Sequence, residues 1–313
     1  MTRILVTGGA GFIGSHVVCA LVARGDEVVV VDDLSAGRRE HVPEGVSLVV
    51  GDLAAEGVAP RVVDGCAAIV HCAARTSVQA SVEDPCDSNR RNLEVSTRLL
   101  LAARTAGVRR LVYSSTAAAY GDRVDGPAGE ERREAPVSPY GMNKLAAEQL
   151  FRMAPELYGV DTICLRYFNV YGPRQDPASP YSGVISIFVR CAAEGRGPTI
   201  FGDGRQSRDF VYVADVVRAN LLALDAARGG GLVCNVATGR TVDLLTLWDV
   251  VREVAGRPDL EPVLGPPRAG DIRVSAARVE RAARELGFRA GTDLREGLAR
   301  TLSWYRSTLR GAC

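Results

Sequence analysis

The N-terminal stretch that decides the fold is Arg3-Ile4-Leu5-Val6-Thr7-Gly8-Gly9-Ala10-Gly11-Phe12-Ile13-Gly14. Its apolar run predicts a strand buried on both faces, followed by a helix from about Gly11 to Arg24. Glycines at this junction permit a tight turn and close backbone approach, so a pyrophosphate can sit on the helix N-terminus. A second buried strand ends at Asp32, where an acid accepts hydrogen bonds from a ribose 2′-hydroxyl and repels a 2′-phosphate. The stretch therefore predicts an NAD site in preference to NADP; the alternative is a glycine-rich turn with Asp32 as a helix cap.

Short apolar runs alternate with helical patterns through the first half of the chain. Further strands are expected at 67–71, 110–114 and 161–166, and helices at 92–106 and 140–158. Helical patterns in the less regular second half fall at 214–227, 243–255, 275–286 and 294–309. This order predicts an α/β fold: a Rossmann-type doubly wound parallel sheet with a smaller mixed α/β C-terminal domain. The expected NAD-binding domain is 1–170, with re-entry of the chain near 210–236, and the expected substrate domain is 171–313.

Composition argues against several classes of partner. The formal net charge of the 313-residue chain is +1, so neither a nucleic acid nor a membrane surface is expected, and arginine pairs such as Arg90-Arg91 are expected to be solvated. The eight cysteines form no Cys-x-x-Cys pair and the three histidines lack ligand spacing, so reduced thiols and no metal site are expected. The chain opens with a strand instead of a signal peptide and has no membrane-spanning apolar run, which predicts a cytoplasmic protein.

Lysine occurs once in the chain. The 38 basic residues are thirty-seven arginines and Lys144, which lies four residues after Tyr140 in Ser138-Pro139-Tyr140-Gly141-Met142-Asn143-Lys144. A compact ammonium and a planar guanidinium are not interchangeable at a tight site, and residues four apart share one helix face. A nearby ammonium is expected to lower the pKa of Tyr140 and make it an acid/base group. The alternative is a surface lysine beside an ordinary tyrosine.

Together, the glycine loop and Tyr140-x-x-x-Lys144 resemble an extended short-chain dehydrogenase/reductase, and most of all the nucleotide-sugar 4-epimerases. The resemblance runs almost end to end through independent motifs in the same order. These are Val31-Asp32-Asp33-Leu34-Ser35-Ala36-Gly37-Arg38, Gly51-Asp52-Leu53, His71-Cys72-Ala73-Ala74, Asn92, Arg166-Tyr167-Phe168-Asn169-Val170-Tyr171-Gly172-Pro173, Phe201-Gly202-Asp203-Gly204, Arg208-Asp209-Phe210 and Arg268-Ala269-Gly270-Asp271.

The resemblance implies roles for particular residues. The NAD-binding set is Gly8, Gly11, Phe12, Ile13, Gly14, Asp32, Asp33, Leu34, Ser35, Gly37, Asp52, Leu53, Ala73, Ala74, Asn92, Ser114, Tyr140, Lys144 and Tyr167. The UDP-sugar set is Thr116, Tyr140, Asn169, Arg190, Arg208, Arg268, Asp271 and Ser275. An arginine fork suits a diphosphate, although each residue could instead be a loop cap or a surface charge. Asp33 departs from the asparagine usual beside the ribose acid.

The segment Ser114-Ser115-Thr116-Ala117-Ala118-Ala119-Tyr120-Gly121 separates reaction types within the family. The resemblance places Thr116 where a Ser or Thr hydrogen-bonds the sugar 4-hydroxyl. Relatives that eliminate water have Asp-Glu directly after this residue, and relatives that decarboxylate have glutamate at the position of Ala118. Ala117 and Ala118 can do neither, which favours epimerisation unless another carboxylate reaches the site. The catalytic set is then Tyr140, Lys144 and Thr116.

The resemblance implies an isomerase that inverts C4 of a hexose through a transient 4-keto sugar, with NAD retained. Arg190 falls where UDP-glucuronate 4-epimerases have an arginine, so UDP-glucuronate is favoured over UDP-glucose and UDP-galactose, with UDP-N-acetylglucosamine third; Ser275 leaves room for an N-acetyl group. Alternatively, Arg190 is a solvated helix residue. A nucleotide-sugar dehydratase or decarboxylase and a non-catalytic NAD sensor stay open as other functions. The resemblance also implies a homodimer through 92–106 and 140–158.

Overall fold

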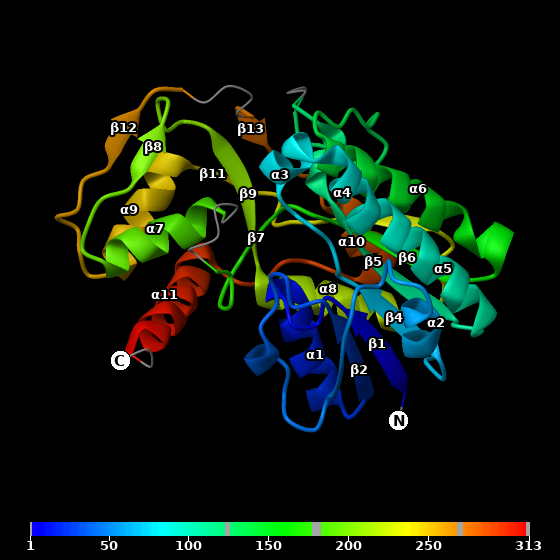
Figure 1. Cartoon of the computed structure of the whole chain (residues 1–313). Helices are drawn as coiled ribbons and strands as arrows, with labels where there is room; N and C mark the ends of the chain where they lie inside the picture. Colours follow the sequence, from blue (N-terminus) through cyan, green and yellow to red (C-terminus); the bar gives the residue numbers. More distant parts are fainter. Residues whose placement is uncertain (1, 123–125, 177–182, 268–271, 311–313) are drawn as a thin grey trace.

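A computed structural model of the chain describes residues 2–122, 126–176, 183–267 and 272–310. Within these residues the main feature is a seven-stranded sheet in the order β10-β6-β5-β4-β1-β2-β3, with every neighbouring pair parallel (Figure 1). Its strands are β1 (Arg3–Thr7), β2 (Glu27–Asp32), β3 (Ser47–Val50), β4 (Ala68–His71), β5 (Arg110–Thr116), β6 (Asp161–Tyr167) and β10 (Leu232–Val236). Apolar residues fill the central strands, as expected for a sheet buried on both faces.

Helices cover both faces of this sheet. One face is packed by α1 (Phe12–Arg24), α8 (Val213–Asp225) and α10 (Glu280–Leu286). The other is packed by α2 (Val58–Val63), α5 (Val95–Thr105) and α6 (Pro139–Tyr158), with the short α3 (Val78–Glu83) and α4 (Pro85–Asn89) against α6. The predicted Rossmann-type doubly wound fold is therefore confirmed. None of the helices in the described part of the chain is long and apolar enough to cross a membrane.

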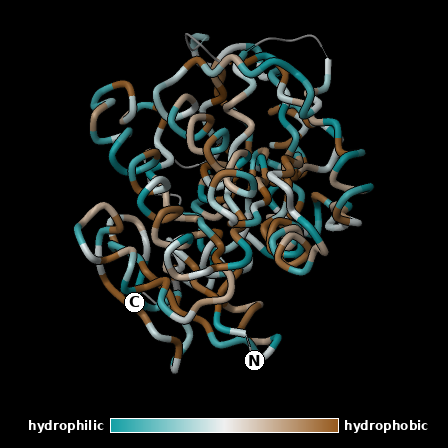
Figure 2. The backbone as a smooth tube through the Cα atoms, turned by 90° about the vertical axis from the view of Figure 1, so that its right-hand side faces the viewer, coloured by the Kyte–Doolittle hydropathy of each residue, from teal (hydrophilic) through white to brown (hydrophobic). Residues whose placement is uncertain are grey.

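A smaller lobe lies to one side of the large sheet (Figure 1). Its strands are β7 (Asn169–Tyr171), β9 (Ser207–Tyr212), β11 (Thr241–Asp243) and β13 (Val274–Ser275) in one sheet, and β8 (Thr199–Phe201) and β12 (Val263–Gly265) in another. Its helices are α7 (Val184–Ala193), α9 (Leu244–Val254) and α11 (Leu294–Arg310), and they enclose a core that contains Phe188 and Trp248. Hydrophobic and hydrophilic residues are interspersed along the backbone (Figure 2).

The chain crosses between the lobes more than once. After β9 in the small lobe it returns through α8 to β10, which pairs with β6 at the edge of the large sheet. The helix expected at 275–286 is wrong at its start, because α10 begins only at Glu280. Ser275 belongs instead to β13, where it pairs with Arg208 of β9, and Ala277 bridges Ala128. These tertiary pairings outweigh the local helical pattern. The proposed division into domains stays a prediction.

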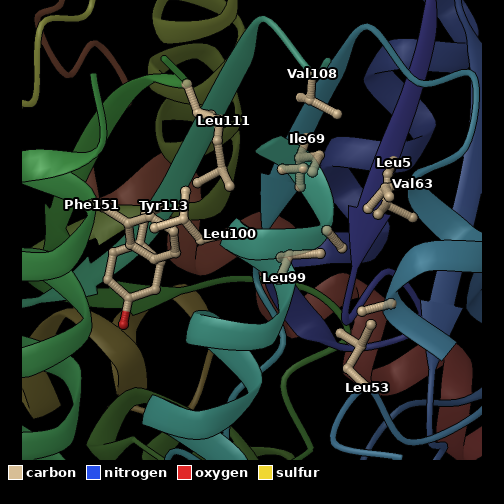
Figure 3. Packing of buried hydrophobic residues seen from close by; sticks show 14 of the residues in the cluster. Leu5, Leu53, Val63, Ile69, Leu99, Leu100, Val108, Leu111, Tyr113 and Phe151 are labelled. Carbon is tan, nitrogen blue, oxygen red and sulfur yellow. The ribbon is translucent and has the colours of Figure 1, made fainter. Parts of the chain in front are cut away.

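Helix α6 is anchored by the largest hydrophobic cluster, part of which Figure 3 shows. Phe151 of α6 is fully buried, and its ring lies 4.6 Å from that of Tyr113 on β5 and 6.1 Å from that of His71 on β4. The neighbouring side chains come from strands β1, β4 and β5 and from α5, among them Leu5, Ile69, Leu99, Leu100 and Leu111. The helix that carries Tyr140 and Lys144 is thereby fixed against the sheet.

Candidate active site

A cleft of about 650 Å³ lies at the carboxyl ends of the parallel strands. It is centred on β1, whose neighbours β2 and β4 lead away in opposite directions, the position at which open α/β sheets bind ligands. Residues after β1, β2, β3, β4, β5 and β6 line it, and Val170, Arg174, Gln175 and Asp176 close it from the small-lobe side. The cleft therefore draws on segments far apart in the sequence.

The glycine loop after β1 forms one wall of the cleft. Gly8 has φ +66°, and a Cβ there would lie 2.7 Å from the backbone nitrogen of Ala73, so only glycine fits this approach of β1 and β4. A Cβ at Gly14 would collide with the carbonyl oxygen of Gly8. The first turn of α1 has neither a side-chain cap nor an acidic residue. Its N–H groups and dipole are therefore free for an anion, and the loop fits the pyrophosphate of NAD.

Asp32 ends β2 beside this loop. Its Oδ2 accepts a hydrogen bond from the N–H of Ala10 at 2.9 Å, and its Oδ1 accepts one from Leu34 at 2.9 Å. Burial raises the pKa of Asp32, and these two hydrogen bonds oppose the rise. Asp32 does not cap a helix, because α1 has Gly11 at its N-cap. The carboxylate connects the glycine loop to the β2 turn and lines the cleft where a ribose would lie.

The acids that line the cleft after β2 and β3 have arginine partners. Asp33 pairs with Arg91 at 2.9 Å, and Asp52 pairs with Arg90 at 2.6 Å. Arg91 also lines the cleft, so the expectation that the Arg90-Arg91 pair is simply solvated is wrong. These arginines follow α4 in a π-helical turn at Arg90–Glu94, which no pattern in the sequence predicts. Ser35 and Asp52 also line this end of the cleft. Leu34 is not among the described lining residues and has a positive φ of 58°.

Asn92 supports the loop after β4 and is not among the described residues that line the cleft. Its side-chain oxygen accepts a hydrogen bond from Arg75 N–H at 3.0 Å, and its amide donates to the carbonyl of Ser88 at 3.0 Å. On the opposite side of the loop, Ala73 N–H donates to Thr7 Oγ1 at 3.1 Å. These contacts position Ala73 and Ala74, which do line the cleft.

Tyr140, Lys144 and Thr116 share one wall of the cleft, as predicted from their spacing and motif. The Tyr140 hydroxyl and the Thr116 side chain are hydrogen-bonded. The Lys144 ammonium nitrogen lies 4.2 Å from the centre of the Tyr113 ring, and the lysine is buried. Ser114 and Tyr167 extend this wall with a hydrogen bond of 3.2 Å between their hydroxyl groups.

The pKa of Tyr140 is shifted in the opposite direction from the one predicted. Burial raises the pKa of Tyr140, and the hydrogen bond with Thr116 only partly offsets the rise. Burial also lowers the pKa of Lys144 to about 7. The expectation that Lys144 lowers the pKa of Tyr140 is therefore not met in the protein alone, because desolvation of both groups dominates. Burial therefore favours the neutral form of both side chains in the protein alone.

The expected sugar-binding residues lie in the small lobe. Asn169 donates to the Asp209 carbonyl at 3.0 Å, and the pairing of Ser275 with Arg208 puts all three on the β7-β9-β13 sheet. None of them is among the described residues that line the cleft. Arg190 is on α7, which packs on α11, and it is also absent from the described lining of the cleft. Arg268 and Asp271 are outside the described residues.

Some cleft residues had no signal in the sequence beyond a loop motif. Arg174 and Gln175 follow β7, and Arg174 has a φ of +67°, a strained conformation for a side-chain-bearing residue. Cys72 lines the cleft beside Ser114, whose hydroxyl donates to its sulfur at 3.2 Å. The β5 segment that carries Thr116 contributes no carboxylate to the described lining. The described residues form no cluster of three or more potential metal ligands.

The fold, glycine loop and Tyr140–Lys144 wall define an extended short-chain dehydrogenase/reductase. Residues 4–237 match the NAD dependent epimerase/dehydratase family, and the chain belongs to this family. A UDP-glucose 4-epimerase from Mycolicibacterium smegmatis is 39% identical over 97% of this chain and 99% of the relative. The structure of a Thermotoga maritima UDP-glucose 4-epimerase with UDP-glucose is 40% identical, with a TM-score of 0.94 over 98% of this chain and 100% of that one. The structure of MoeE5 with UDP-glucuronic acid and NAD is 38% identical, with a TM-score of 0.87 over 98% and 99%. The predicted family and NAD dependence are confirmed.

Gly14→Ala should lower the affinity for NAD by about tenfold or more, because the added methyl group forces the glycine loop out of its tight turn. The measurement is NAD binding by isothermal titration calorimetry, with far-UV circular dichroism to verify folding. Gly291→Ala is the matched control, since a Cβ there meets no atom closer than 3.6 Å. Wild-type affinity in Gly14→Ala would contradict the assignment of this loop.

Proposed function

We propose that the protein is an NAD-dependent UDP-sugar 4-epimerase, an isomerase that acts on carbohydrates. The observation that carries the proposal is the shared wall of Tyr140, Lys144 and Thr116, followed by Ala117 and Ala118, which lack carboxylates. Relatives named UDP-glucose 4-epimerase, which match nearly the whole chain, support the same activity. Elimination or decarboxylation would need an acid beside Thr116 that this wall does not supply.

Tyr140 is the proposed acid/base group. Its phenolic oxygen takes the proton of the sugar 4-hydroxyl, with the Thr116 hydroxyl as relay, and returns it after the sugar has turned. When bound, NAD supplies the hydride acceptor and donor, together with a positive charge that favours a phenolate at Tyr140. Lys144 favours the same phenolate whenever it is charged. The transient species is a 4-keto sugar, and its rotation exposes the opposite face of C4.

We also propose binding roles for the remaining residues. The glycine loop (Gly8, Gly11, Phe12, Ile13, Gly14) would hold the pyrophosphate, and the residues around β2 and β3 (Asp32, Asp33, Leu34, Ser35, Gly37, Asp52, Leu53) the adenosine. Ala73, Ala74, Ser114 and Tyr167 would face the rest of NAD, with Asn92 as a support. Asn169, Arg208, Ser275, Arg268 and Asp271 are proposed to bind the nucleotide-sugar.

The NAD-binding domain is proposed as 1–170 plus 210–236. The described cysteines are free thiols, which supports a cytoplasmic location.

Among the hexoses we favour UDP-glucose and UDP-galactose. Arg190 is the reason to consider UDP-glucuronate, and it is not among the described residues that line the cleft. Relatives named UDP-glucose 4-epimerase also favour UDP-glucose and UDP-galactose. The likeness to MoeE5, whose structure contains UDP-glucuronic acid, keeps the acidic sugar as the second candidate.

Parallel incubations with UDP-glucose, UDP-glucuronate and UDP-N-acetylglucosamine, without added reductant, should give the C4 epimer of UDP-glucose at unchanged mass. NMR spectroscopy identifies the epimer, and mass spectrometry excludes loss of water or carbon dioxide. Arg190→Ala should leave this turnover within about twofold of wild type, as expected for a residue away from the cleft. Turnover of UDP-glucuronate alone, abolished by Arg190→Ala, would reverse the hexose assignment. A change of mass would favour a lyase.

Tyr140→Phe should lower kcat by about 10²–10⁴-fold, because it removes the hydroxyl that accepts and returns the proton. Initial-rate kinetics measure this effect, and NAD binding should stay near the wild-type level. Tyr158→Phe, at the far end of the same helix, is the control and should retain activity. Full activity in Tyr140→Phe would remove the central residue of the mechanism and leave NAD sensing as the better explanation.

We propose a homodimer through α5 and α6. Large apolar side chains are exposed on these helices: Leu101 at 46%, Met153 at 48% and Leu157 at 60%. The two helices pack against each other, and large apolar side chains exposed on neighbouring helices support an interface there. Light scattering after size exclusion should give twice the mass of one chain for wild type and for Val263→Glu, and the single mass for Leu157→Glu. A monomeric wild type would refute the dimer.

A further inference from the structure

Glu148 lies on the same face of α6 as the proposed catalytic pair. Tyr140, Lys144 and Glu148 are spaced by four residues, so they succeed one another along one side of the helix. Glu148 is fully buried, although it has no place among the described lining residues of the cleft. A buried carboxylate is costly unless it is ion-paired and hydrogen-bonded. Glu148 is therefore expected to have hydrogen-bond and ion-pair partners in the interior.

The Glu148 carboxylate joins α6 to two strands. Its Oε2 accepts hydrogen bonds from Ser115 Oγ at 2.6 Å and from Arg166 Nε at 2.9 Å, and its Oε1 accepts one from Arg166 Nη2 at 2.6 Å. Ser115 directly precedes Thr116 on β5, and Arg166 directly precedes Tyr167 on β6. One side chain thus positions the helix of Tyr140 and Lys144 relative to the strand ends that carry Thr116 and Tyr167.

Glu148 and Arg166 are the two fully buried charges of an ion-pair network that reaches the surface through Glu134 and Arg152. Arg166, itself fully buried, also pairs with Glu134 at 2.6 Å, so one arginine is shared by two carboxylates. Glu134 is 22% exposed and also lies 4.0 Å from Arg152, so its charge has a second partner at the surface. The ammonium of Lys144 lies one helical turn from Glu148 on the same face of α6.

Glu148 is the one anionic group that acts on Lys144 from the elements packed around it in the described residues. The other titratable groups around Lys144 are neutral at pH 7, because burial favours their uncharged forms. They are His71 and Cys72 near β4, Tyr113 on β5, Cys164 on β6 and Tyr140 on α6. Burial lowers the pKa of Lys144 to about 7, and Glu148 opposes this fall. The two thiols oppose it only when they ionise, which burial delays.

We infer that Glu148 is a positioning residue of the proposed reaction: its buried carboxylate fixes α6 against the ends of β5 and β6 and keeps Lys144 in its charged form. The inference rests on the proposed function, because a charged Lys144 matters there for stabilising the phenolate of Tyr140. Without this carboxylate, the ammonium would lie among neutral groups, and desolvation would favour the free amine at lower pH.

The test uses the fact that Lys144 is the only lysine in the chain. Labelling with ε-¹³C-lysine gives one side-chain NMR signal that needs no assignment, and its titration reports the protonation of Lys144 in the NAD-saturated protein. Glu148→Gln, which retains the shape of the side chain, should lower the titration midpoint by about one pH unit or more. In Glu148→Asp, which retains the negative charge, the midpoint should return most of the way to the wild-type value. An unchanged midpoint in Glu148→Gln would overturn the inference.

Glu134→Gln is the matched control, because it removes the other carboxylate that pairs with Arg166. The Glu134 side chain is 22% exposed, so solvent screens its charge, and the Lys144 midpoint should change less than in Glu148→Gln. Should Glu148→Gln not fold, Ser115→Ala serves in its place. It removes one hydrogen bond but no charge, and it should lower kcat several-fold without moving the midpoint. Wild-type kcat in this variant would contradict the positioning role.

Activity against pH gives the second readout. In Glu148→Gln the alkaline fall of kcat should begin at lower pH than in wild type, because the ammonium is lost at lower pH. A purely structural role for Glu148 would lower activity equally at all pH values, and that result would also overturn the inference. The NMR titration needs no turnover. An inactive wild type with a lowered midpoint in Glu148→Gln would therefore refute the proposed function and leave the charge assignment intact.

Discussion

Helix α6 packs across the ends of β5 and β6, and the arrangement of the whole candidate catalytic wall depends on this contact. Phe151 inserts among the apolar side chains of the sheet, while Glu148 accepts hydrogen bonds from Ser115 and Arg166. Apolar packing supplies most of the stability of such a contact, and the buried ion pair specifies its register. Tyr140 and Lys144 occupy the same helix nearer its N-terminus, so their distance from Thr116 depends on Phe151, Glu148 and Arg166, which are not among the described residues that line the cleft.

The sequence predicts those parts of the site that local structure determines. The glycine loop follows a strand and opens a helix, so its function can be predicted from spacing alone, and Asp32 ends the next strand at the expected distance. Tyr140 and Lys144 share a helix face because the helical repeat requires it. The strand–helix alternation predicts the parallel sheet for the same reason. In each case the pattern lies within one helix or within one strand–helix–strand unit.

What the sequence could not predict depends on tertiary contacts. Arg190 is on α7, which packs on α11, and it is absent from the described lining of the cleft. Ser275 is in a strand because β9 offers it a partner. The positive φ of Arg174 leaves no pattern in the sequence. Burial of Tyr140 and Lys144 shifts both pKa values against the expected effect of their proximity, since desolvation depends on everything packed around them.

The central claim is that C4 of the sugar is inverted by removal and return of the same hydrogen, with no exchange with water. Incubation of the protein with UDP-glucose deuterated at C4 in ordinary water, followed by NMR spectroscopy of the UDP-galactose formed, tests this most directly. The account predicts that deuterium stays at C4 of the product, because it leaves and returns as hydride inside a closed cleft. Product with hydrogen at C4 would show that a proton from solvent was added there, and would contradict the account.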